Sequence, residues 1–155
     1  MSYRSNSILY FHMPRTAGDS IRESITNFPD KCCIITHDKI RPDIFKKSVI
    51  TSFTFIRNPY DRLYSAYNWI ANRDVKNNEK LKEFDTREYN FLQKQNFKDF
   101  NDFASSITYD DITQDFMIHF CPMWRWISDN RTAKILIRNI FLYEDIENFK
   151  FDKFK

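Results

Sequence analysis

A short apolar run, followed by a loop that holds the only glycine of the chain, most constrains the fold. Residues 8–11 (ILYF) are apolar without interruption, which is typical of a strand buried on both faces. Gly18 supplies conformational freedom where the chain turns into a helix. The backbone amides of such a loop form an anion site at a helix N-terminus, and Arg15, Thr16 and Ser20 add donors. The stretch therefore predicts a strand–loop–helix that holds a phosphate-like group.

Further apolar runs alternate with segments of helical pattern. Residues 32–36 (CCIIT) and 49–56 (VITSFTFI) predict two more strands, and residues 20–27 predict a helix between the first two strands. This alternation indicates an α/β fold with a parallel sheet. Ligands of such sheets bind at the carboxyl ends of the strands, where His12, His37 and Arg57 fall.

The second informative stretch begins at the end of the third expected strand. Asn58 suits the N-cap of a helix and Pro59 suits its first position. Ser65 follows Arg57 by eight residues, so an arginine fork and a hydroxyl converge on what we interpret as a second phosphate site. The helix also carries an apolar stripe that should face a core: Leu63, Ala66, Tyr67 and Ile70.

The rest of the chain is less regular. Residues 73–98 are polar with mixed charges and predict a solvent-facing excursion or a mobile loop on the acceptor side. Residues 100–107 and 113–120 predict two short helices, and residues 121–127 predict an aromatic loop. Residues 134–144 predict one or two further strands.

Composition sets the broad class. The 155 residues suit one domain with a real core, and we treat residues 1–155 as a single domain that is short at its C-terminus. A net charge of +3 is too small to argue for nucleic acid. The three histidines and three cysteines lack metal-ligand spacing, so no metal is expected. No apolar stretch reaches membrane-span length and no signal-peptide core is present, which favours a soluble, cytoplasmic protein.

Three segments together resemble the sulfotransferase superfamily, most closely its carbohydrate (membrane-type) branch and bacterial relatives. HMPRTAGDS (residues 12–20) resembles the 5′-phosphosulfate loop of that family. FTFIRNPYDRLYSAY (residues 53–67) is similar to its 3′-phosphate element, in which an arginine and a serine eight residues later bind the phosphate. PMWRWISD and ILIRNIFLYEDIENF give a weaker third match. The first two matches, in this order and spacing, are the specific ones.

The resemblance implies a P-loop-NTPase-like parallel sheet flanked by helices and the donor 3′-phosphoadenosine 5′-phosphosulfate (PAPS). The reaction would be in-line transfer of a sulfuryl group to an acceptor hydroxyl, by default one of a glycan, without a metal. Arg57 and Ser65 would hold the 3′-phosphate of the donor. The residues placed around the 5′-phosphosulfate are Arg15, Thr16, Ala17, Gly18, Asp19 and Ser20.

Two residues are the catalytic candidates. Arg15 takes the position of a family lysine that contacts the bridging oxygen. His37, at the end of the second expected strand, is the candidate general base, with Asp38 and Asp19 as competitors.

Departures from the family pattern leave a second hypothesis open. Arginine at position 15 keeps the charge of the lysine but cannot donate a proton in the same way. Asp19 replaces a threonine and Met123 replaces a glutamine. Together with the short C-terminus, these changes are compatible with a nucleotide-binding pseudoenzyme. A nucleotide kinase or NTPase is disfavoured, because the loop has one glycine and no GK[ST] sequence.

Overall fold

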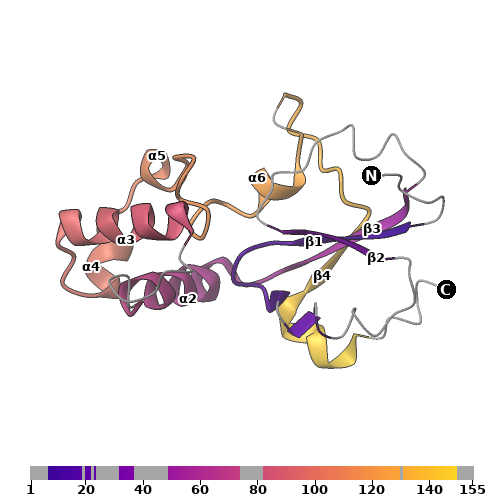
Figure 1. Ribbon diagram of the computed structural model, residues 1–155, viewed down its shortest axis with the longest axis horizontal. Coiled ribbons are helices and arrows are strands. Elements are labelled where there is room, and N and C mark those ends of the chain that lie inside the picture. The colour runs from indigo at the N-terminus through magenta and orange to yellow at the C-terminus, as the bar shows by residue number, and fades with distance from the viewer. Residues whose placement is uncertain are drawn as a thin grey trace. The chain divides into compact units, whose positions relative to one another are not determined.

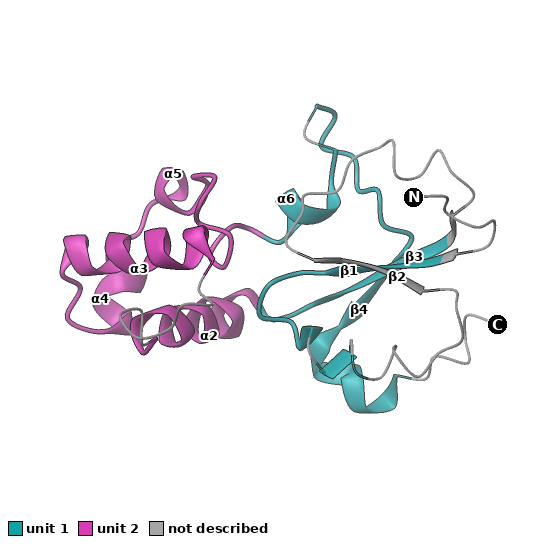
Figure 2. Ribbon diagram, in the orientation of Figure 1, with its two compact units in different colours: residues 1–58, 123–155 teal, residues 59–122 magenta. Residues whose placement is uncertain are grey.

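The chain folds into two units, each with its own apolar core. The computed structural model describes residues 7–18, 20–21, 23, 32–36, 49–73, 82–129 and 131–149 (Figure 1). Residues 1–58 and 123–155 form unit 1, and residues 59–122 form unit 2 (Figure 2). Along the chain, unit 2 is inserted between the two segments of unit 1.

Unit 1 is built on a parallel sheet. Its strands are β1 (Ser7–His12), β2 (Cys32–Thr36), β3 (Val49–Ile56) and β4 (Asn139–Leu142). They run in the order β2-β1-β3-β4, and every neighbouring pair is parallel. The short helix α6 (Trp124–Ile127) and the 3₁₀ helix η2 (Tyr143–Asn148) lie on opposite sides of the sheet in Figure 1. The predicted α/β fold with a parallel sheet flanked by helices is confirmed.

The two central strands are apolar because both of their faces are covered. Leu9, Tyr10 and Phe11 of β1 are buried, as are Phe53 and Phe55 of β3. The rings of Tyr10 and Phe53 stack across the strand pair with centroids 5.0 Å apart. Uninterrupted apolar sequence is what a strand in the middle of a covered parallel sheet requires.

The strand order has its switch point at the carboxyl ends of β1 and β3. From β1 the chain crosses to β2 on one side and later returns to β3 on the other, so the connections diverge at this point. Phe11 pairs in register with Thr54, whose buried hydroxyl donates to the Phe11 carbonyl at 2.7 Å. This bond fixes the two strand ends that lead into the loop after β1 and into Arg57 after β3.

Unit 2 contains four helices among the described residues: α2 (Pro59–Ala71), α3 (Glu83–Gln95), α4 (Phe100–Ser106) and α5 (Tyr109–Ile112). The predicted stripe of α2 does face the core, since Ala66 and Ile70 are buried and Leu63 and Tyr67 pack against them. The other buried members of this core are Leu92, Phe103, Met117 and Phe120. None of the helices in the described ranges is long and apolar enough to span a bilayer.

Two expectations for the middle of the chain are wrong. Residues 74–81 of the stretch 73–98 lie outside the described residues, and the rest of the stretch contains α3, which buries Asp85, Glu88 and Leu92 along one face. Positions 85, 88 and 92 have helical spacing, but two of them carry charge, so an apolar pattern does not reveal them. Residues 113–120 form turns instead of a helix, whereas α4 agrees with the helix predicted for 100–107. The predicted aromatic loop at 121–127 contains the single turn α6.

Candidate functional site

The loop after β1 is held by a buried hydrogen bond and turns directly into helical structure. Thr16 is fully buried, and its hydroxyl donates to the Met13 carbonyl at 2.8 Å. Arg15 and Ala17 have left-handed backbone conformations, with φ values of 66° and 57°. Such angles are uncommon for residues with a side chain and cost of the order of 1 kcal/mol or more each. The first helical hydrogen bond follows at once, from the Ile21 amide to the Ala17 carbonyl at 3.1 Å.

Gly18 is required for space and not for its backbone angles. The φ angle of Gly18 is not positive. The left-handed residues of the loop are Arg15 and Ala17, so the expected need for glycine's conformational freedom is wrong. A β-carbon at position 18 would lie only 1.7 Å from Nε2 of His12. The imidazole of His12 therefore lies against the backbone of the loop, and any side chain at position 18 would displace it.

Arg57 follows β3 at the same edge of the sheet. Its guanidinium carbon lies 4.9 Å from the centroid of the Tyr143 ring, which fixes the direction of the half-buried side chain. Its Nε atom is buried and has no hydrogen-bond partner among the described residues. A buried donor without an acceptor is costly, so this atom is suited to an anionic oxygen brought by a ligand.

The carboxylate of Glu144 interacts electrostatically with Arg57. Oε1 of Glu144 accepts a hydrogen bond from the Asn58 amide at 2.8 Å. This bond, a further one from the backbone of Glu144 itself and the positive charge of Arg57 hold the pKa of Glu144 below its usual range. Glu144 is therefore ionised at neutral pH, and its negative charge lowers the positive electrostatic potential around Arg57.

The other predicted site residues are placed as follows. Ser20 is exposed in the helical turn after the loop. Ser65 is half-buried in α2 and belongs to unit 2. Asp19 and His37 lie outside the described residues. The structure thus brings two groups to the carboxyl ends of the adjacent parallel strands β1 and β3. The first is the loop of residues 15–18, and the second is Arg57.

These features define a class of protein: a parallel α/β fold with anion-binding groups at the point where its strand order diverges. Loop amides ahead of a helical turn and an arginine with an unsatisfied buried donor both fit oxygens of phosphate or sulfate.

The comparison with protein families places the chain more closely. It matches the sulfotransferase family over residues 4–148 and belongs to that family. Searches against curated proteins and against solved structures gave no significant match. Membership supports sulfuryl transfer to a hydroxyl-bearing acceptor, and the family generally uses PAPS as the donor.

Unit 2 contains a buried polar cluster that the sequence analysis missed. Oε2 of Glu88 lies 2.6 Å from Nδ1 of His119, and Oε1 of Glu88 accepts from the His119 amide at 2.8 Å. Asp85 lies one turn before Glu88 and pairs with Arg73 at 3.0 Å. Burial, the largest influence, and the charge of Asp85 raise the pKa of Glu88 to about 9. The spacing of Asp85 and Glu88, three residues apart, is the one sequence signal for this cluster. It lies in a segment that the sequence predicts to face solvent.

The side chains of the cluster contact one another and two arginines. Single ligand atoms of Asp85, Glu88 and His119 all lie within 4.8 Å of one another, a spacing that metal sites use. However, Arg73 already neutralises Asp85. Arg62 adds a second positive charge, and its Nη1 atom donates a hydrogen bond to the Cys121 carbonyl at 3.0 Å. With Glu88 protonated, the described groups form a hydrogen-bonded network in which a further cation would face two guanidinium groups.

Proposed function

We propose that the protein transfers a sulfuryl group from PAPS to a hydroxyl group of a carbohydrate. Family membership supports sulfuryl transfer, and the resemblance of residues 12–20 and 53–67 to the two phosphate-binding elements supports PAPS as the donor. The carbohydrate acceptor rests on the resemblance to the carbohydrate branch. The observation that carries the proposal is the buried, unsatisfied Nε of Arg57 at the carboxyl end of β3.

The donor would bind at the carboxyl ends of β1 and β3. Backbone amides from Arg15 to Gly18, with the helical turn behind them, suit the 5′-phosphosulfate. Arg57 suits the 3′-phosphate, because its guanidinium is already oriented by the Tyr143 ring and gains a missing acceptor. Ser65 is proposed as the second 3′-phosphate ligand from its sequence position alone, eight residues after Arg57.

PAPS supplies an activated sulfuryl group, and the residues of the chain position it and balance charge. The acceptor oxygen attacks sulfur, the bond to the bridging phosphate oxygen breaks, and 3′-phosphoadenosine 5′-phosphate (PAP) leaves. Arg15 stabilises the charge that develops on the leaving oxygen. His37 is proposed to take the proton of the acceptor hydroxyl.

Calorimetric titration with PAP tests the donor site. We expect the wild type to bind PAP and Arg57→Ala to bind about 10- to 100-fold more weakly, the range for losing charged hydrogen bonds. Arg57→Lys should recover only part of the loss, because it lacks the planar fork. Arg131→Ala, which changes an exposed arginine of unit 1, is the matched control. A well-folded wild type that does not bind PAP would refute the proposal.

Arg15 and Asp19 favour a second candidate, a pseudoenzyme that binds the nucleotide without turnover. The two candidates separate in a PAP-release assay with PAPS and a panel of oligosaccharides. An enzyme forms PAP from PAPS in an acceptor-dependent reaction that His37→Ala slows. A pseudoenzyme binds PAP in calorimetry but forms no PAP from PAPS.

A further inference from the structure

The strand β4 forms one edge of the sheet in unit 1. Among the described strands it pairs with β3 alone, so its other edge has no neighbouring strand. The backbone N–H and C=O groups along such an edge are a template on which another strand can pair. The four residues of β4, NIFL, include no charged residue and no proline, the residues that commonly block such pairing. This edge is therefore chemically suited to the addition of a strand.

The exposed side chains of β4 are aliphatic. Burial alternates along the strand, because Asn139 and Phe141 are half-buried whereas Ile140 and Leu142 are 38% and 50% exposed. The Phe141 ring belongs to the core face of the sheet, with its centroid 5.7 Å from that of Phe55. Since successive side chains of a strand point to opposite faces, Ile140 and Leu142 share the other face. Two large aliphatic side chains thus stand in solvent on the edge strand.

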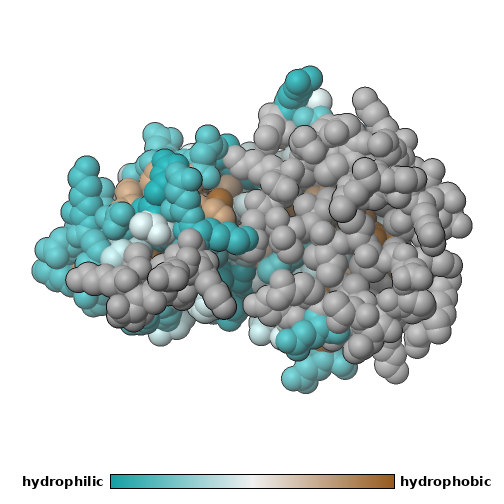
Figure 3. Space-filling view, viewed as in Figure 1, coloured by the Kyte–Doolittle hydropathy of each residue, from teal (hydrophilic) through white to brown (hydrophobic). Residues whose placement is uncertain are grey.

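The charges on the two sides of β4 have opposite signs. Within residues 131–149 the exposed cations all precede the strand, and the exposed carboxylates all follow it in η2. The surface at the place of η2 is hydrophilic in Figure 3. The cations are Arg131, Lys134 and Arg138, and the carboxylates are Glu144, Asp145 and Glu147. A partner strand of uniform charge would be attracted at one end of this edge and repelled at the other.

A second copy of the chain in antiparallel orientation matches both the aliphatic and the charged pattern. An antiparallel pair centred on Phe141 sets Ile140 of each copy opposite Leu142 of the other. The same two-fold axis sets the basic end of each edge beside the acidic end of the other, whereas a parallel pair would bring like charges together. A shift of the register by two residues would set Leu142 opposite Arg138, so the pattern favours one register.

We propose that the β4 edge pairs with the β4 edge of a second copy and joins the two sheets into one across a two-fold axis. The contact is short, so the dimer is weak, with a dissociation constant of the order of 10 to 100 µM. Its ion pairs are exposed, so salt weakens it further. The proposal concerns unit 1 alone and is independent of the proposed function.

Sedimentation equilibrium of the full chain in low salt, from about 1 µM to 1 mM, tests the proposal. The average mass of the wild type should rise with concentration from that of one chain towards that of two. Ile140→Lys and Leu142→Glu should each weaken the dimer about tenfold or more, because each sets a charge against an aliphatic side chain. An equal mixture of these two variants should dimerise again, because the introduced lysine and glutamate face each other in the mixed dimer.

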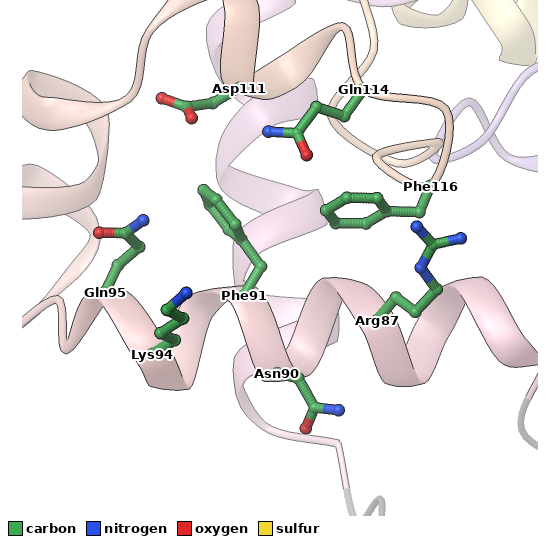
Figure 4. Close-up of a pocket in the computed structure, with 8 residues that line it drawn as sticks. All are labelled: Arg87, Asn90, Phe91, Lys94, Gln95, Asp111, Gln114 and Phe116. Carbon is green, nitrogen blue, oxygen red and sulfur yellow. The ribbon is translucent and has the colours of Figure 1, made fainter.

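Reversal of charge tests the ends of the edge. Arg138→Glu should weaken the dimer about three- to tenfold in low salt, because attraction becomes repulsion at two symmetric positions. Arg87→Glu is the matched control, since it makes the same change at an exposed arginine in the wall of a surface pocket of unit 2 (Figure 4). The control should dimerise like the wild type. Circular dichroism verifies the fold of each variant, and the replaced side chains are all exposed.

Four results would overturn the proposal. A wild type that stays monomeric at about 1 mM would leave the edge to a partner other than a second copy. A dimer that neither substitution in β4 weakens would place the contact on another face. A mixture that associates no better than its two components would refute the antiparallel register. An Arg87→Glu variant as impaired as Arg138→Glu would make the effect one of overall charge.

Discussion

Replacing Glu88 tests whether the buried cluster of unit 2 is held together by a protonated carboxyl group. Glu88 has no exposed surface, and its two carboxyl oxygens contact the amide and Nδ1 of His119. Glu88→Gln keeps the shape, an acceptor for the amide and a donor for Nδ1, and so mimics the protonated acid. Glu88→Ala removes both contacts and leaves a cavity.

The expected magnitudes differ because of what each variant leaves unpaired. Glu88→Ala strands the buried amide and imidazole nitrogen of His119, at about 1–3 kcal/mol for each group, so we expect a loss of about 3–5 kcal/mol in the free energy of unfolding. Glu88→Gln should cost about 1 kcal/mol or less. If Glu88 were instead ionised and balanced Arg62 and Arg73, glutamine would leave buried positive charge and cost as much as alanine.

The pH dependence provides a second readout. The pKa of Glu88 is raised from 4.5 to about 9 in the folded protein. A carboxyl with a raised pKa contributes stability that is complete below pH 4.5 and is lost as the pH rises through about 9. Above pH 7 an unfolded histidine is mostly neutral, so the free energy of unfolding of the wild type should fall, relative to Glu88→Gln, by about 1.4 kcal/mol from pH 7 to 8 and by less from pH 8 to 9.

Urea unfolding followed by circular dichroism at pH 7, 8 and 9 measures both quantities for the wild type and the two variants. The reasoning is refuted if Gln and Ala are equally destabilising at pH 7, or if the difference between wild type and Glu88→Gln stays constant from pH 7 to 9. The first result would mean an ionised Glu88, and the second would mean that no proton is held at this site.

Three further perturbations test unit 1. Gly18→Ala should lower the free energy of unfolding by about 1–3 kcal/mol and abolish PAP binding, because the new β-carbon overlaps the imidazole of His12. Adding His12→Ala removes that overlap and should restore much of the stability and of the PAP binding. Glu144→Gln, which keeps an acceptor but removes charge near Arg57, should tighten PAP binding about two- to fivefold in low-salt calorimetry; unchanged affinity would contradict the coupling. Thr54→Val should cost about 1–2 kcal/mol in urea unfolding through its lost buried hydrogen bond, and a neutral change would contradict that role.

The two central strands of unit 1 could be predicted because residues on both of their faces are buried. Residues 32–36 and 49–56 match β2 and β3, and the run at 8–11 lies within β1, since a covered parallel strand must be apolar on both faces. The hypothesis of an anion-binding loop rests on the same logic, because the strand–loop–helix order places amides at the strand end. The role of Gly18 could not be predicted, because its reason is the imidazole of a residue six positions earlier.

Unit 2 was harder to predict because charged residues occupy part of its interior. The face of α3 that packs inward carries Asp85 and Glu88, whose partners are Arg73 and His119. Their burial depends on contacts between residues up to 31 positions apart, which no local pattern encodes. The segment was therefore interpreted as a solvent-facing excursion, although Phe84 and Leu92 offered an apolar signal at its core-facing side.

The same physical argument separates the two kinds of buried polar atom in this chain. Glu88 is buried and satisfied, since both of its oxygens have partners, and the consequence is a stable network in unit 2. Nε of Arg57 is buried and unsatisfied at the open end of a strand, where a guanidinium remains charged at any accessible pH. A protein keeps such a donor only at a cost unless a ligand offsets it. Arg57, and not the buried carboxyl–imidazole pair, is therefore where we propose that an anion binds.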